Sequence, residues 1–97
     1  MNIIRIIIID DHPVVREGLR GMLASQQDFE VIGEAEEGAA GVELIAALQP
    51  DVTLMDLRMP GLDGVGALEA IRRRGLPARV LVLTTYDSDT DLSLIHI

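Results

Sequence analysis

Residues 51–61, DVTLMDLRMPG, decide the fold of this chain of 97 amino acids. A hydrophobic run of β-type composition leads to a single carboxylate, Asp56, and the pair Pro60 and Gly61 then turns the backbone away. In an open α/β sheet, functional groups gather beyond the carboxyl ends of the strands. We therefore expect Asp56 to end a central strand and to face the ends of neighbouring strands.

Three further segments are predicted to be strands. Residues 2–9 are nearly continuous in β-branched residues, as in a strand buried on both faces, and the carboxylates Asp10 and Asp11 follow them. Residues 29–35 alternate apolar and polar side chains, which predicts a half-exposed edge strand. Residues 79–84 form a fourth apolar run, which ends at the hydroxyl residue Thr84. Three of the four predicted strands therefore end at a polar side chain.

Between these strands, apolar residues recur at helical spacing in residues 13–25, 39–48 and 66–74. In the first of these helices we expect one apolar face and one face turned to water. The apolar face comprises Val14, Val15, Leu19, Met22 and Leu23, and the other comprises Arg16, Glu17 and Arg20. Strands that alternate with helices indicate a parallel, doubly wound α/β sheet. The carboxyl-end rim of that sheet would carry Asp10, Asp11, Asp56 and Thr84.

Composition excludes several other classes of protein. The formal net charge of −8 argues against a nucleic-acid-binding surface, and the one basic cluster, residues 72–74, is typical of the last turn of a helix. The absence of Cys excludes disulfides and thiolate metal sites. No apolar run approaches the length of a membrane span and no signal peptide is recognisable, so we expect a cytoplasmic location without membrane association.

The three carboxylates would repel one another unless a hard cation lies between them, which predicts a Mg²⁺ site. A carboxylate screened in this way can attack phosphorus, so Asp56 is the candidate nucleophile and Asp10 and Asp11 anchor the ion. For Asp56 alone the simpler interpretation is a solvated loop residue before a turn. We interpret His12 as a surface or capping residue, because no Ser or Cys nucleophile accompanies it.

These motifs resemble the receiver domain of response regulators, the phosphoacceptor half of two-component signalling. The resemblance covers residues 3 to about 91. It implies that Asp56 accepts a phosphoryl group from the phosphohistidine of a sensor histidine kinase. It further implies that Asp11 binds Mg²⁺ directly, Asp10 through water and Arg58 through its backbone carbonyl. The hydroxyl of Thr84 would couple the phosphoryl group to a conformational switch.

Residues 10–19, DDHPVVREGL, look like the NarL/FixJ subfamily, whose receivers precede a LuxR-type helix-turn-helix. The resemblance implies a flavodoxin-like (CheY-like) sheet of order 2-1-3-4. The intact protein would control transcription through a C-terminal DNA-binding domain and could form a homodimer. Such a receiver is no enzyme in the usual sense, because it catalyses only its own phosphorylation and dephosphorylation.

The chain departs from this family at its end. Family members have a fifth strand that supplies a Lys to the phosphoryl group, followed by a last helix, whereas this chain contains no Lys. We therefore expect the fifth strand and last helices to be missing and residues 80–83 to form an uncovered sheet edge. The chain would then be marginally stable or unfolded. Phosphotransfer to Asp56 would be weak, because one charge partner is absent.

Residues 86–91 resemble the acidic opening of a helix, but residues 92–97, LSLIHI, do not continue it. The same six residues are the translation of CTG TCT CTT ATA CAC ATC, the end of a transposon used to prepare sequencing libraries. We interpret residues 1–91 as a partial receiver domain and residues 92–97 as a non-native tail read through from an adapter.

Two other functions remain open. A Mg²⁺-dependent phosphohydrolase of the haloacid dehalogenase type would also use an Asp nucleophile, but it needs an acid two residues later, where this chain has Arg58. A receiver without an output domain would act as a phosphate sink. Sustained turnover of a phosphomonoester distinguishes the first from a receiver, and a DNA-binding domain in the same reading frame excludes the second.

Overall fold

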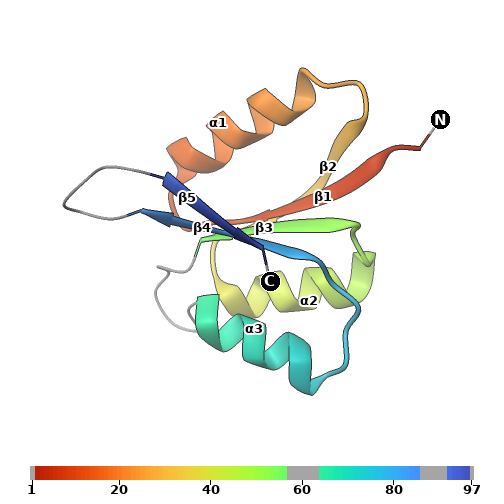
Figure 1. Ribbon diagram of the computed structural model, residues 1–97, viewed down its shortest axis with the longest axis vertical. Helices are drawn as coiled ribbons and strands as arrows, with labels where there is room; N and C mark the ends of the chain where they lie inside the picture. The colour runs from red at the N-terminus through yellow and green to blue at the C-terminus, as the bar shows by residue number, and fades with distance from the viewer. Residues whose placement is uncertain (1, 57–63, 86–91, 97) are drawn as a thin grey trace.

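The computed structural model describes residues 2–56, 64–85 and 92–96. Within these ranges the strands form one five-stranded sheet of order β2-β1-β3-β4-β5 (Figure 1). The strands are β1 (Ile4–Ile9), β2 (Phe29–Ala35), β3 (Val52–Asp56), β4 (Val80–Thr85) and β5 (Leu92–His96). The helices are α1 (Pro13–Ala24), α2 (Gly38–Leu48) and α3 (Gly64–Arg73).

The first four strands are parallel and follow the order 2-1-3-4, as expected from the sequence. The bounds of these strands and of the three helices differ from the predicted ranges by no more than two residues at either end. Strand β2 lies at the edge of the sheet and is mostly half-buried, which its alternating pattern predicted. The prediction of a doubly wound α/β fold is therefore confirmed.

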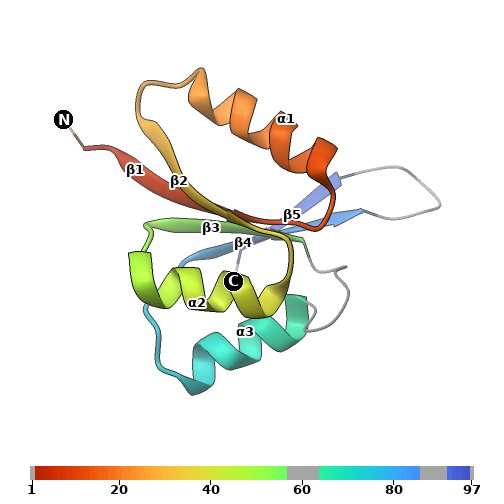
Figure 2. The same cartoon turned by 180° about the vertical axis from the view of Figure 1, so that it is seen from behind.

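The helices form a layer on each side of the sheet. Helix α1 covers one face, and α2 and α3 lie together on the other (Figures 1 and 2). The main hydrophobic core lies on the α2 and α3 side, where Ile9, Met55 and Val82 of the central strands meet Ile45 and Ala67 of the helices. Branched aliphatic residues fill this core, as a sequence so poor in aromatic residues requires.

The expectation of an uncovered edge at residues 80–83 is wrong. Strand β5 pairs with β4 in antiparallel register, with Leu94 opposite Leu83, and Leu83 is 6% exposed. An open strand edge accepts any extended apolar segment within reach, whatever its origin. Residues 86–91, which we expected to begin a helix, lie outside the described residues.

Helix α1 also differs from its predicted orientation. Val14 and Met22 are 82% and 66% exposed, and the helix has no fully buried residue. The side chain of Arg16, which we expected in water, is only 16% exposed. Arg16 shares its helix face with the half-buried Leu19 and Leu23, three and seven residues later, and this face is turned towards the sheet. The helical spacing therefore placed Leu19 and Leu23 on the correct face, but it placed Val14, Met22 and Arg16 on the wrong one.

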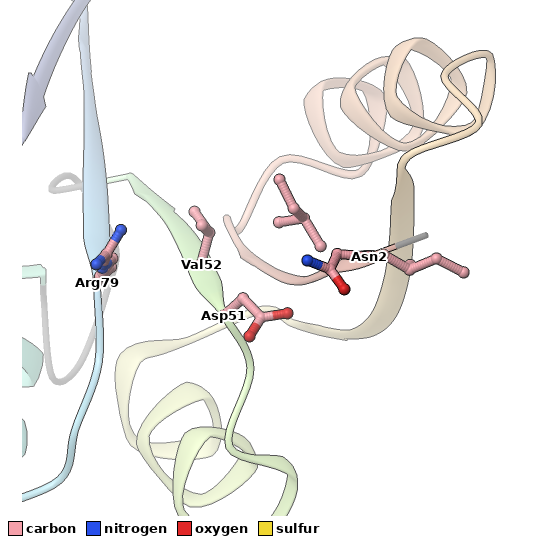
Figure 3. A pocket seen from close by; sticks show the side chains of 6 residues that line it. Asn2, Asp51, Val52 and Arg79 are labelled. Carbon is pink, nitrogen blue, oxygen red and sulfur yellow. The ribbon is translucent and has the colours of Figure 1, made fainter.

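A hollow of about 670 Å³ opens at the amino ends of the strands (Figure 3). Its lining comprises Asn2, Ile3, Ile4, Asp51, Val52 and Arg79. The side chain of Asp51 accepts a 2.8 Å hydrogen bond from the backbone N–H of Arg5 at this end of the sheet. The hollow therefore lies at the rim opposite to that of the predicted phosphoacceptor.

Among the described helices, none is both long enough and apolar enough to cross a lipid bilayer.

Candidate functional site

Two parallel strands bring the predicted site residues to one rim of the sheet. Asp56 is the last residue of β3, and Asp10 directly follows β1. In the register of these strands Ile9 lies opposite Met55, so the residues that come next, Asp10 and Asp56, are neighbours. The backbone N–H of Asp10 also donates a 3.0 Å hydrogen bond to the carbonyl of Ala35, which fixes the end of β1 against β2.

The carboxylates of Asp10, Asp11 and Asp56 meet in a small, largely buried space. Asp10 is 3% exposed and Asp56 is 9% exposed, whereas the side chain of Asp11 is 24% exposed. One oxygen from each carboxylate and one ring nitrogen of His12 all lie within 4.8 Å of one another. The structure thus brings together the three carboxylates that the sequence analysis placed at one rim.

The donor set of this pocket fits a hard divalent cation. Oδ1 of Asp11 is buried, and it faces the ring nitrogen Nδ1 of His12 at 2.9 Å. Three carboxylates in so small a space repel one another, and a bound cation would offset that repulsion. Mg²⁺ prefers oxygen ligands and binds through one or two carboxylates with retained water, so Asp10, Asp11 and Asp56 could hold it.

His12 belongs to the same cluster, which the sequence analysis did not foresee. Its side chain is 62% exposed and it occupies the N-cap position of α1, but it makes no capping hydrogen bond. Its Nδ1 instead lies 3.0 Å from Oδ1 of Asp10 and 2.9 Å from Oδ1 of Asp11. The hydrogen bond to Asp10, and then the charges of Asp11, Asp10 and Asp56, raise the pKa of His12 above its ordinary value. Its position directly after two Asp residues was the signal for this contact.

The structure says less about the other two predicted site residues, Thr84 and Arg58. Asp56 pairs with Leu83 across β3 and β4, so the backbone of Thr84 comes next on the same rim. The role of its hydroxyl stays a prediction. Arg58, predicted to offer its backbone carbonyl to the ion, lies outside the described residues.

Arg16 holds the backbone beside the acidic pocket in place. Its Nη1 donates a 2.7 Å hydrogen bond to the backbone carbonyl of Asp10. Its Nε lies 3.5 Å from Glu34 and its Nη2 lies 3.7 Å from Glu36. The guanidinium therefore joins α1 to the ends of β1 and β2, and it fixes the backbone that carries Asp10.

Replacement of Arg16 by Ala should lower the free energy of unfolding by about 1 to 3 kcal/mol, because the buried Asp10 loses this donor and Glu34 loses a close partner. The matched control is Arg20→Ala. Arg20 also lies near Glu34, at 3.3 Å, but its side chain is 54% exposed, so its loss should cost less than about 1 kcal/mol. Urea unfolding of both variants measures the difference, and equal losses would contradict this role of Arg16.

Comparison with known proteins identifies the family. The model of the response regulator receiver domain matches residues 6–94. The chain is 49% identical over 86 residues to the transcriptional regulatory protein LiaR of Bacillus subtilis, covering 89% of this chain and 41% of LiaR. It is 46% identical over 84 residues to the probable transcriptional regulatory protein NarL of Mycobacterium tuberculosis, covering 87% of this chain and 39% of NarL. The chain thus spans about two fifths of these relatives.

Solved structures agree with this assignment. The signal receiver domain of the putative response regulator NarL from Mycobacterium tuberculosis superimposes with a TM-score of 0.84 at 44% identity, covering 92% of this chain and 72% of that one. The isolated receiver domain of RcsB from Salmonella enterica, determined with the phosphomimetic BeF₃⁻, gives a TM-score of 0.79 at 33% identity, covering 90% of this chain and 65% of that one. The chain therefore belongs to the response regulator receiver domain family, with relatives among the NarL-type transcriptional regulators.

Proposed function

We propose that this chain is a phosphoacceptor, in which Asp56 takes up one phosphoryl group from the phosphohistidine of a sensor histidine kinase. The observation that carries this proposal is the position of Asp56. It ends a central strand, it is 9% exposed, and its carboxylate meets those of Asp10 and Asp11 within 4.8 Å. A lone solvated Asp in a loop would have no such neighbours.

In the proposed reaction a carboxylate oxygen of Asp56 forms a bond to phosphorus. The bond between phosphorus and the donor imidazole breaks, and its electron pair stays on the imidazole nitrogen, which takes up a proton from solvent. Mg²⁺ held by Asp10, Asp11 and Asp56 would supply positive charge that offsets the repulsion between carboxylate and phosphoryl oxygens. Asp10 and Asp11 would hold the ion, and strand β3 fixes the position of Asp56 at its end.

In the intact protein we propose that this phosphorylation controls transcription in the cytoplasm, with Thr84 as the switch hydroxyl and Arg58 as a further metal ligand. The names of LiaR and NarL as transcriptional regulators support this, as does the part of their length that lies beyond this match. DNA binding would be the task of a separate output domain, since the net charge of −8 does not favour contact with phosphates here.

The test is to incubate the chain with acetyl phosphate, a small phosphoryl donor, and to measure its intact mass. With Mg²⁺ we expect a part of the chains to gain the mass of one phosphoryl group, located on Asp56 by peptide mapping, because phosphotransfer without the Lys partner is slow. With EDTA in place of Mg²⁺ we expect no added mass. Equal labelling with EDTA would contradict the proposal, and sustained hydrolysis of a phosphomonoester would favour the phosphohydrolase.

We further propose that residues 1–91 belong to the receiver and that residues 92–97 come from adapter sequence. The identity of LSLIHI with the translated end of a transposon supports this origin for the last six residues. Sequencing the gene by a method that uses no transposon tests this: we expect a different sequence after about residue 91. A reading frame that encodes LSLIHI in the genome would contradict it.

A further inference from the structure

His12 occupies the part of the pocket in which a cation would be expected. Its Nδ1 lies 3.0 Å from Oδ1 of Asp10, 2.9 Å from Oδ1 of Asp11 and 3.8 Å from Oδ2 of Asp56. A single nitrogen atom therefore faces all three carboxylates. The same three side chains would provide the oxygens for Mg²⁺ in the proposed function.

The ring and the ion cannot use these oxygens at the same time. Mg²⁺ requires oxygen ligands at about 2.0 to 2.1 Å in near-octahedral geometry, with several retained waters. The Nδ1 of His12 stands within hydrogen-bond distance of the two oxygens that would point at the ion. Mg²⁺ has little preference for imidazole as a ligand. Binding of the ion therefore requires the ring to leave.

The position of His12 allows the ring to leave without disturbing the fold. Its side chain is 62% exposed and makes no capping hydrogen bond to α1. The backbone N–H of His12 donates a separate 2.8 Å hydrogen bond to Oδ1 of Asp10, and this contact does not depend on the ring. Rotation about the side-chain bonds alone would move the imidazole into solvent.

We propose that the imidazole ring of His12 occupies the acidic pocket until Mg²⁺ displaces it. The ring thus competes with Mg²⁺ and lowers the affinity of the site for the ion. The ring holds the three carboxylates together while no ion is bound. It also sets how much Mg²⁺ is needed before Asp56 can accept a phosphoryl group. This role rests on the proposed function in one respect, because it takes Mg²⁺ as the ion of the pocket.

The test is a Mg²⁺ titration of the whole chain, followed by the backbone amide NMR signals of residues 10–12. We expect His12→Ala to bind Mg²⁺ about three- to tenfold more tightly than the wild type, because the ion no longer displaces a charge-assisted contact. His12→Ser should behave in the same way, and Ser is a favourable N-cap residue, so this variant protects the fold of α1. His96→Ala controls for the loss of a histidine, since His96 is the only other one in the sequence.

In the wild type we also expect the ring signals of His12 to shift over the same range of Mg²⁺ concentration as the amide of Asp10. An unchanged or weaker Mg²⁺ affinity in both His12 variants would overturn the proposal and leave the proposed function intact. A wild-type chain that binds no Mg²⁺ would instead overturn the proposed function, and this proposal with it.

Discussion

The variant Asp56→Asn should incorporate no phosphoryl group from acetyl phosphate under conditions that label the wild type. The change keeps the size and shape of the side chain, but it removes the nucleophilic carboxylate. It also removes one of the three charges that the pocket offers to a cation, so we expect Mg²⁺ to bind more weakly. Intact mass spectrometry measures the incorporated phosphoryl group directly.

The control for this result is Asp51→Asn. Asp51 precedes the same strand but lies at the opposite rim of the sheet, where it lines the hollow (Figure 3). Its carboxylate accepts a hydrogen bond from the backbone N–H of Arg5. Its replacement should leave phosphoryl incorporation at the level of the wild type. Both variants should retain a cooperative unfolding transition in circular dichroism. Continued labelling of a folded Asp56→Asn chain would show that another residue accepts the phosphoryl group.

The variant Gly41→Val should destabilise the fold by about 2 to 3 kcal/mol. Gly41 lies in α2 where the helix approaches the sheet, and Ile9 of β1 is fully buried beneath it. A Cβ atom at this position would stand 2.8 Å from Cγ1 of Ile9, 3.1 Å from its Cγ2, and closer still to its Cδ1. Because Ile9 is enclosed by the core, it cannot move aside, and the helix must shift away from the sheet.

The matched control is Gly18→Val in α1. A Cβ atom at Gly18 would meet no heavy atom within 4 Å. The substitution should therefore change the free energy of unfolding by no more than about 0.5 kcal/mol, the scale of a helix-propensity effect. Urea unfolding of the two variants compares the same chemical change at a packed and at an open position. Losses of similar size at both positions would show that the close packing of α2 on β1 contributes little.

The central part of the fold could be predicted because its signals are local and agree with one another. Continuous apolar runs define β1, β3 and β4, and the helical spacing of Val42 and Ile45 defines the buried face of α2. The meeting of Asp10 with Asp56 follows from parallel strands that end on the same rim. No detailed knowledge of side-chain packing was needed for either step.

The features that the sequence analysis missed depend on contacts between distant segments. Arg16 is turned towards the sheet because Glu34 and Glu36 lie at the end of β2, and no local pattern in α1 reports this. His12 faces the carboxylates because the cluster of negative charge attracts the nearest donor. The pairing of β5 with β4 arises because the edge of β4 is open and an extended apolar segment lies within reach. The inferred foreign origin of this segment gives no indication of such pairing.

The proposed site would hold one cation among three carboxylates from two parts of the chain, Asp10 and Asp11 after β1 and Asp56 at the end of β3. The most direct test is a crystal structure of the chain grown with Mn²⁺, a Mg²⁺ substitute whose anomalous scattering locates it without ambiguity. We predict one strong anomalous peak bordered by the carboxylates of Asp10, Asp11 and Asp56, with the ring of His12 turned out of the pocket. A peak elsewhere, or three side chains too far apart to share one ion, would contradict the account.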